Sequence, residues 1–174
     1  MPDPLVRRVF PAEVPAVLDD LAAVLVDAVA SGMALGFLAP FTLDDARRAW
    51  HAMRSQLGDD HVLFGALEGR RLVGTAQLVV SEAANSRHRA EVAKVAVAAE
   101  DRGQGIGSRL MEAVEAYAVA RDVTLLWLTT HADTPAARFY ERRGYVLLGE
   151  MPDYSRQSDG TLWPGAFYYR ALER

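Results

Sequence analysis

The sequence predicts a mixed α/β fold in which helices cover both faces of one central sheet. Short runs of branched residues alternate with longer segments in which apolar residues recur every three or four positions, in the order β-α-α-β-β-β-α-β-α-β-β. A hairpin meander occupies the middle of this order, and strand–helix units follow it. The 174 residues, 51% of them hydrophobic, suit a single domain that spans residues 1–174.

The first third of the chain predicts one strand and two helices. Residues 5–10 are short and branched, as in a strand, and a helical apolar pattern covers residues 13–30. Residues 31–41 hold two glycines and a proline, which indicates a loop. Thr42 then caps a second helix with an acidic capping-box partner three residues on, and we expect Gly58 to end that helix.

The middle of the chain predicts a hairpin, two buried strands and a helix. Residues 61–80 form two strand-like runs around a turn at residues 68–70. Residues 90–98 carry small and branched side chains on both faces, which is typical of a central strand. A helix over residues 106–121 and a second buried strand over residues 124–130 follow.

The last part predicts a helix and two strands. Thr134 and Pro135 are typical of an N-cap and a first helical position, and Gly144 of a helix end. Residues 145–151 and 166–172 are expected to be strands joined by a long irregular segment.

Composition excludes several classes of function. The chain has no cysteine, which excludes disulfides, thiolate nucleophiles and cysteine-bound metals. Its four histidines lack metal-ligand spacing, so we expect no metal. A net charge of −4 argues against a nucleic-acid partner. The first residues lack the apolar core of a signal peptide and Asp27 interrupts the most apolar run, so we expect a cytoplasmic protein without membrane contact.

Residues 101–111, DRGQGIGSRLM, form the most distinctive motif. Their glycines follow neither the dinucleotide fingerprint G-x-G-x-x-G nor the lysine-containing P-loop. Glycine lets backbone N–H groups approach a ligand closely, and the helix that follows adds a partial positive charge. With the charge of Arg102, the loop suits a pyrophosphate. A tight strand-to-helix turn that simply needs glycine is the alternative.

The loop and its flanks resemble the GNAT superfamily of N-acetyltransferases. Arg102, Gly105 and Gly107 match the family's Q/R-x-x-G-x-G/A motif, AEVAKVAV is similar to its fourth strand, and ADTPAARFYERRGY to its fifth-strand exit and following helix. The resemblance implies a mixed, mostly antiparallel sheet of about seven strands flanked by four helices, with acetyl-CoA as co-substrate. The segment GFLAPF and the C-terminal tail also resemble the narrower tabtoxin-resistance-type group.

In this family the fourth and fifth strands splay apart and acetyl-CoA lies between them. Backbone groups of residues 104–108 would then wrap the pyrophosphate, Val95 and Val97 would pair with the pantetheine arm, and the backbone at Val97 would lie near the thioester carbonyl. The residues that the resemblance assigns to the donor site are Val95, Ala96, Val97, Arg102, Gly103, Gln104, Gly105, Ile106, Gly107, Ser108, Thr134, Ala137 and Tyr140.

Three residues are candidates for catalysis. An alkyl amine has a pKa of about 10, so it needs a base at neutral pH. Glu91 stands where the family often places its base, unless it only pairs with a basic neighbour such as Lys94. Tyr140 matches the family's proton donor to the leaving sulfur, and core packing is its alternative. Asp133 either caps the helix or holds a cationic substrate amine, which makes it a reserve base, and His131 is expected to be a solvated loop residue.

The resemblance therefore implies direct acetyl transfer to a primary amine of a small molecule. The narrower resemblance suggests an amino-acid-like or antibiotic-like acceptor and a resistance role, with the acceptor held by residues 31–41 and the last hairpin. A protein or peptide N-acetyltransferase and a non-catalytic acyl-CoA sensor stay open as alternatives, and so does assembly into a homodimer.

Overall fold

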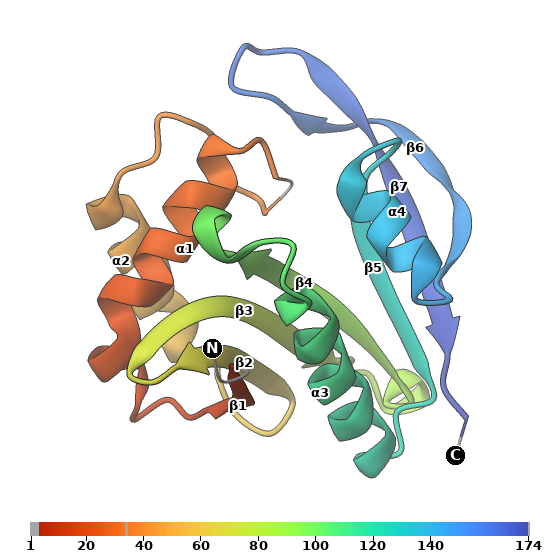
Figure 1. Cartoon of the computed structure of the whole chain (residues 1–174). Coiled ribbons are helices and arrows are strands. Elements are labelled where there is room, and N and C mark those ends of the chain that lie inside the picture. The colour runs from red at the N-terminus through yellow and green to blue at the C-terminus, as the bar shows by residue number, and fades with distance from the viewer. Residues whose placement is uncertain (1–3, 34, 174) are drawn as a thin grey trace.

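A computed structural model describes residues 4–33 and 35–173, which fold around one seven-stranded sheet (Figure 1). Its strands are β1 (Leu5–Val9), β2 (His61–Glu68), β3 (Arg71–Val80), β4 (Arg89–Val97), β5 (Leu125–His131), β6 (Val146–Arg156) and β7 (Leu162–Ala171). They lie in the order β1-β2-β3-β4-β5-β7-β6, and every neighbouring pair is antiparallel except β4 and β5. The predicted mixed, mostly antiparallel fold is confirmed.

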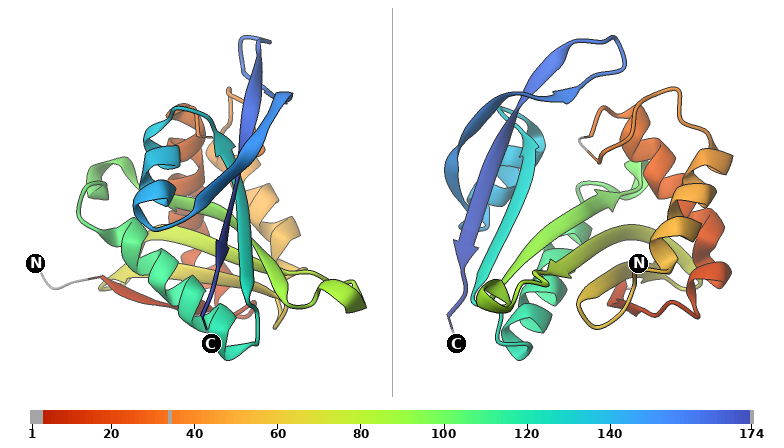
Figure 2. Two further views of the ribbon diagram at one scale, coloured as in Figure 1. Left: turned by 90° about the vertical axis from the view of Figure 1, so that its right-hand side faces the viewer. Right: turned by 180° about the vertical axis from the view of Figure 1, so that it is seen from behind.

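Four α-helices cover the two faces of the sheet (Figures 1 and 2). They are α1 (Leu18–Ala30), α2 (Leu43–Arg54), α3 (Ile106–Ala120) and α4 (Pro135–Arg142). Buried residues of α3 and α4 share one apolar core, and those of α1 and α2 share another on the opposite face. In the second core the indole of Trp50 donates a hydrogen bond of 2.9 Å to the carbonyl of Leu21, which satisfies the only donor of this buried side chain.

Two helix boundaries differ from the prediction. The first helical segment opens with a 3₁₀ turn at Val14–Val17, and α1 itself starts at Leu18. The capping box of Thr42 opens α2 as predicted, but the helix ends at Arg54 and Ser55 is its C-cap. Gly58 lies outside the helix because its N–H already donates to the carbonyl of His61 in the bend before β2.

The last hairpin is longer than predicted. β6 and β7 extend through most of the segment that was expected to be irregular, and only residues 157–161 turn between them. Pro152 lies within β6, where the pairing with β7 shifts register between Met151 and Ser155. A proline is tolerated there because β6 is the edge strand and the N–H that proline lacks needs no partner.

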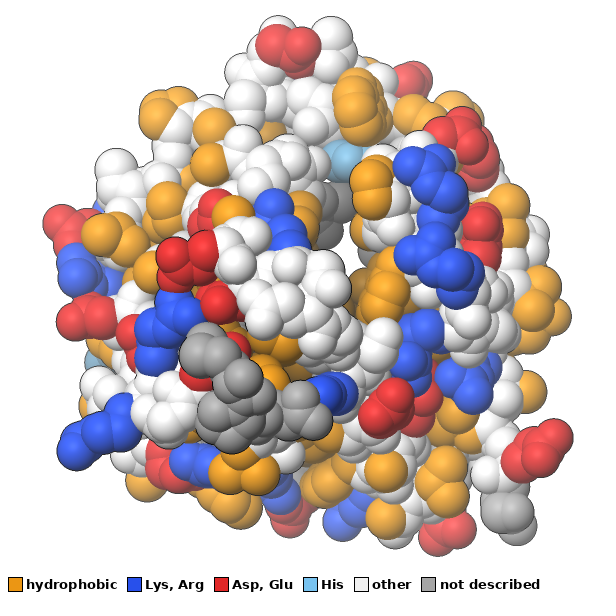
Figure 3. All heavy atoms as spheres, in the orientation of Figure 1, with side chains coloured by type: hydrophobic (Ala, Val, Ile, Leu, Met, Phe, Trp, Pro, Cys, Tyr) orange, Lys and Arg blue, Asp and Glu red, His pale blue; other side chains and the backbone are white. Residues whose placement is uncertain are grey.

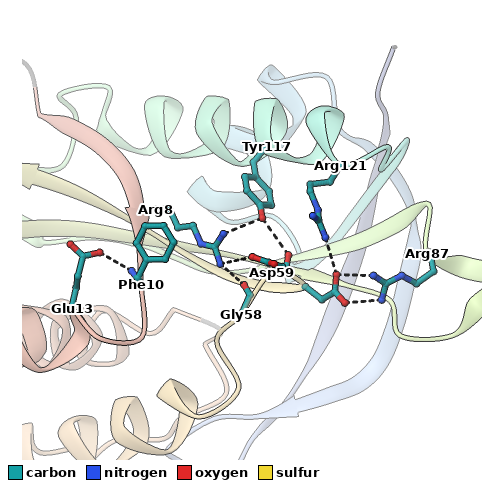
Figure 4. Close-up of polar contacts among 9 residues, drawn as sticks. Arg8, Phe10, Glu13, Gly58, Asp59, Arg87, Tyr117 and Arg121 are labelled. Atoms are coloured by element: carbon teal, nitrogen blue, oxygen red, sulfur yellow. Dashed lines mark hydrogen bonds and ion pairs between the residues drawn. The ribbon is translucent and has the colours of Figure 1, made fainter.

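Polar contacts join β1 and the end of α3 to the connection before β2 (Figure 4). Arg8 donates to the carbonyl of Gly58 at 2.9 Å and to the hydroxyl of Tyr117 at 3.4 Å. Asp60 accepts two hydrogen bonds of 2.8 Å from Arg87. Exposed pairs of this kind each contribute about 0–1 kcal/mol to the free energy of unfolding. They therefore fix the position of the loop more than they stabilise the fold.

The hydropathy of the helices bears on membrane contact. Across residues 4–33 and 35–173, none of the helices combines the length and the apolar character that crossing a bilayer requires.

Candidate active site

A gap opens in the sheet between β4 and β5. The two strands share only three residue pairs, and Glu91 with Trp127 is the last of them. Beyond this pair β4 continues beside β3 as far as Val97, and β5 continues beside β7 as far as His131. The facing edges therefore have no strand partner, and the surface is hollowed at this position (Figure 3).

A β-bulge bends β4 at the gap. Lys94 and Val95 together oppose Ala76 of β3, and Lys94 adopts a φ of 51°. The hydroxyl of Thr75 donates to the carbonyl of Lys94 at 2.9 Å and so holds the bulge in place. An extra residue in one strand increases its local twist, which turns the end of β4 away from β5.

The backbone of β4 beyond the bulge alternates between β3 and the gap. The N–H of Ala98 donates to β3, so Ala96, two residues earlier, also pairs with β3, and its side chain is buried in the core under α1. The backbone groups of Val95 and Val97 consequently face the gap. Val95 and the N–H of Val97 form an edge that an extended amide chain can pair with, whereas the carbonyl of Val97 already accepts a hydrogen bond from Arg102 and Ala96 does not face this edge.

The glycine loop lies at the end of this strand. Gly103 and Gly105 have φ values of 77° and 79°, which side chains other than glycine rarely adopt. Gly105 is the N-cap of α3 and provides no side-chain cap. The N–H groups of the first helical turn, from Ile106 to Ser108, are thus left for a ligand, and the helix dipole adds partial positive charge.

Arg102 holds the loop in place through its side chain. Its guanidinium donates to the carbonyl of Val97 at 2.9 Å, to the hydroxyl of Ser31 at 3.1 Å and to the carboxylate of Asp27 at 3.0 Å. Asp27 also accepts the N–H of Ala99 at 2.6 Å. The charge of Arg102 is therefore paired with the end of α1, and this contact is one that the sequence did not reveal.

Two helices flank the gap on the same face. A methyl group built on Gly107 of α3 would lie 3.5 Å from the ring of Phe139 on α4, so the two helices are in van der Waals range beside the loop. Ala137 is buried in the core beneath α4. Thr134 caps α4, since its hydroxyl accepts the N–H of Ala137 at 3.2 Å.

Tyr140 of α4 is buried, with 8% of its surface exposed. Its ring packs edge-on against Phe139 and Tyr145, at centroid distances of 5.2 and 5.7 Å. Within the part of the chain that the structure describes, no residue hydrogen-bonds to its hydroxyl. Burial raises the pKa of Tyr140 above its ordinary value of 10, so the hydroxyl keeps its proton at physiological pH. Packing and proton donation are compatible in this position.

Glu91 is half-buried at the start of the gap. Burial raises the pKa of its carboxyl, and the charges of Lys94 and His61 oppose this effect. It lines a hollow of about 850 Å³ together with Val79, Arg89, Trp127 and other residues. In residues 4–33 and 35–173 no basic side chain forms an ion pair with Glu91.

The hollow beside Glu91 lies on the α2 face of the sheet. Glu91 is opposite Val79 on β3, and Gln77, two residues earlier on the same face, contacts Met53 of α2. The hollow therefore occupies the continuation of the face that α1 and α2 cover elsewhere, across the sheet from α3 and α4.

The cap interpretation of Asp133 is wrong. Thr134 performs that role, and Asp133 is exposed, with a φ of 56° in the turn after β5. Its carbonyl accepts a hydrogen bond of 3.2 Å from Arg138, and its side chain is not among those that line the hollow beside Glu91.

The expectation that His131 is a solvated loop residue is also wrong. It is the last residue of β5 and only 4% exposed. Its Nε2 lies 2.9 Å from the hydroxyl of Ser155 and 3.2 Å from the amide nitrogen of Gln157, and its ring packs edge-on against Trp163. Burial lowers the pKa of His131. The strand pattern of residues 125–130, LLWLTT, continues through His131. Extending the predicted strand by this one residue could have predicted that His131 belongs to the strand.

The two segments expected to hold an acceptor meet each other. The N–H of Ala39, in the loop between α1 and α2, donates a hydrogen bond of 2.9 Å to the hydroxyl of Ser158, in the turn between β6 and β7. Figure 2 shows the loop and the hairpin on the two sides of the gap, and this hydrogen bond bridges them. Across the described ranges, the structure brings together no group of three or more side chains suited to hold a metal ion.

Comparison with known proteins agrees with this architecture. Mouse N-alpha-acetyltransferase 80 is 44% identical over 79 residues, which are 42% of this chain and 24% of that protein, so the match spans under a quarter of the mouse protein. An N-acetyltransferase from Staphylococcus aureus Mu50 superposes with a TM-score of 0.78 at 21% identity, over 99% of this chain and 100% of that one.

A third comparison includes a ligand. The structure of yncA from Salmonella typhimurium with its cofactor acetyl-CoA superposes with a TM-score of 0.72 at 16% identity, over 99% of this chain and 96% of that one. At these identities the structural likeness shows the fold. The family model described as "Acetyltransferase (GNAT) family" matches residues 30–145, which are more than half of the sequence. The chain therefore belongs to the acetyltransferase (GNAT) family.

Proposed function

We propose that this acetyltransferase moves an acetyl group from acetyl-CoA directly to the primary amine of a small molecule. The observation that carries the proposal is the gap between β4 and β5, whose free strand edge leads to the glycine loop and the start of α3. The strand edge can pair with the amides of the pantetheine arm, and the N-terminus of α3 can bind the pyrophosphate. Together they suit a coenzyme A thioester.

The donor is held mainly by backbone groups. Val95 and Val97 pair with the amide-bearing arm, and the N–H groups of residues 104–108 surround the pyrophosphate. Arg102 acts by fixing the loop against Val97 and Asp27, since its charge is already paired. Thr134 positions α4, and with it Tyr140, beside the gap.

The transfer needs a proton acceptor at the amine. The amine nitrogen bonds to the thioester carbon, the carbon–sulfur bond breaks, and the sulfur departs with the bonding electrons. The nitrogen loses a second proton as the amide forms, and this proton neutralises the departing thiolate, directly or through a water. Glu91 takes the proton of the ammonium group, directly or through a water, before the attack. Its raised pKa brings the carboxylate closer in basicity to that task.

Tyr140 assists the leaving sulfur. Its hydroxyl is protonated, and no residue of the described ranges uses it. Complete transfer of its proton to a thiolate is uphill, because a thiol has a pKa of about 8.5 and a tyrosine one of about 10 or more. Tyr140 therefore stabilises the departing sulfur chiefly by donating a hydrogen bond, with Asp133 left as a reserve base only.

A small acceptor is favoured by the bridge between Ala39 and Ser158, which narrows the approach to the gap. The similarity to the mouse N-alpha-acetyltransferase supports the second candidate, a protein or peptide N-terminus. The resemblance to the tabtoxin-resistance-type group supports a detoxifying role for the first.

The test monitors thiol release from acetyl-CoA with three acceptor sets: small amines, amino acids and short peptides. Turnover confined to the small amines and amino acids supports the proposal. Turnover with peptides alone establishes the second candidate. Coenzyme A binding without turnover on any acceptor would indicate a sensor, and the absence of binding would overturn the donor assignment.

A further inference from the structure

Lys94 has an unusual environment for a lysine. It occupies the bulge of β4, adopts a φ of 51°, and its side chain is half-buried. Its ammonium nitrogen lies 5.5 Å from the ring centre of Phe37, and a methyl group built on Gly36 would be 3.8 Å from it. The side chain therefore reaches from the sheet to the loop between α1 and α2.

The ammonium of Lys94 forms no ion pair with any residue that the structure describes. Within residues 4–33 and 35–173 no carboxylate lies in salt-bridge range of it, and its contact is with the face of an aromatic ring. Burial lowers the pKa of Lys94, and the charge of Glu91 opposes this effect. A half-buried cation is costly unless an anion pairs with it, so an anion that arrives with a ligand would relieve this cost.

The surroundings of Lys94 place that ligand at the acceptor side of the gap. Phe37 stacks on Phe41, with 4.7 Å between ring centres, in the same loop that bridges to the last hairpin. Glu91 lies three residues earlier on β4, on the other side of the bulge. One strand thus presents a carboxylate and then an ammonium, a pair of charges complementary to an amine and an acid group on one small molecule.

We propose that Lys94 binds a carboxylate of the acceptor, so that the preferred acceptors are amino acids or amino-acid-like compounds that carry both charges. The inference rests on the proposed function, because it assigns the acceptor's amine to Glu91. It adds the group that selects among amines: Lys94 fixes the acid end while the amine end meets the base. Phe37 and Phe41 cover the apolar part between them.

The test compares acceptors in matched pairs that differ only in the acid group, such as γ-aminobutyrate and its carboxamide, and other amino acids with their amides. The measured quantity is the ratio of kcat/KM for the carboxylate to kcat/KM for the carboxamide. Lys94→Met keeps the apolar stem but removes the charge. Because each ratio is compared between wild type and variant, differences in amine basicity cancel.

We expect Lys94→Met to lower this ratio about ten- to a hundredfold, the range that corresponds to the loss of one charge-assisted hydrogen bond. Arg89→Met is the matched control, because Arg89 is a basic residue that also lines the hollow beside Glu91. It should leave the ratio unchanged.

Three outcomes would overturn the inference. Unchanged kcat/KM for both members of each pair in Lys94→Met would show that Lys94 does not contact the acid group. An equal loss on both members of each pair would assign it a role in folding or proton transfer. A fall of the ratio in Arg89→Met but not in Lys94→Met would show that Arg89, rather than Lys94, binds the carboxylate. Turnover of the carboxamides by the wild type keeps the proposed function standing in each case, whereas no turnover of any amine would reject that function itself.

Discussion

Glu91 and Trp127 are the last residues that β4 and β5 pair, so the carboxylate of Glu91 stands at the point where the two strands separate. The position is half-buried, which raises its pKa, and it borders the hollow on the α2 face. A base here reaches the gap from the side opposite to α3 and α4. Donor and acceptor would thus approach from opposite faces of the sheet.

Glu91→Gln should remove the proposed base and leave the fold intact. The amide has the same shape but cannot accept the ammonium proton, so kcat/KM near pH 7 should fall about 10²- to 10⁴-fold. Part of the lost activity should be recovered at high pH, where the amine is deprotonated by solvent. Thiol release measured from pH 6 to pH 10 checks this. A variant profile that parallels the wild type would remove Glu91 from proton transfer.

The same substitution should stabilise the fold. The pKa of Glu91 is raised in the folded state, so its contribution to stability is full below the unfolded pKa and is lost as the pH rises through the folded pKa. At pH 8 the wild type bears the cost of a buried charge that glutamine does not. Denaturant unfolding should show Glu91→Gln to be the more stable protein at pH 8, with a difference that shrinks toward pH 4.5.

The control for this comparison is Glu82→Gln, an exposed position on the same hollow. It should change the free energy of unfolding by no more than about 0.5 kcal/mol. A less stable Glu91→Gln at pH 8 would contradict the argument.

The order of the elements and the glycine loop could be read from the sequence because both are local patterns. Periodicity places strands and helices, and alternating glycines before an apolar helical run are visible at once. Contacts between distant segments leave no such pattern. The partner of Arg102 is Asp27, 75 positions away, and His131 packs against Trp163, which lies in the segment that was expected to be irregular. Pro152 lies within β6 of the same hairpin. Proline fits there only because β6 is an edge.

A pair of alanine substitutions separates the two roles of the glycine loop. Gly107 has room for a methyl group, at an ordinary distance of 3.5 Å from Phe139, and alanine favours a helix by up to about 1 kcal/mol. Gly107→Ala should therefore fold at least as stably as the wild type while weakening the binding of coenzyme A. Calorimetric titration with coenzyme A, alongside thermal unfolding, measures both effects.

Gly105→Ala is the contrasting variant. Its φ of 79° is strained for alanine, at a cost of about 1–2 kcal/mol, so it should lose both stability and affinity. Unchanged coenzyme A binding in a stable Gly107→Ala would argue that the loop is only a tight turn.

Tyr140→Phe removes the proposed hydrogen bond to the departing sulfur without disturbing the core. No residue of the described ranges bonds to the hydroxyl, so its removal leaves no partner unpaired and should change stability by about 0.5 kcal/mol or less. We expect kcat to fall at least tenfold, with the dissociation constant of coenzyme A nearly unchanged. Steady-state kinetics and direct titration give the two numbers. Equal kcat in both proteins would leave Tyr140 a packing residue.

His131 should make the fold sensitive to mild acid. Its folded pKa is lowered by burial, so its contribution to stability is present above the unfolded pKa of about 6.5 and is lost as the pH falls toward the folded value. Over that window one proton binds preferentially to the unfolded chain. The free energy of unfolding therefore falls by up to about 1.4 kcal/mol for each pH unit of acidification. His131→Asn should flatten the fall in stability between pH 6.5 and pH 5, whereas the exposed His88→Asn should not. If both variants keep the wild-type slope, the acid sensitivity arises elsewhere and the buried contact with Ser155 survives protonation.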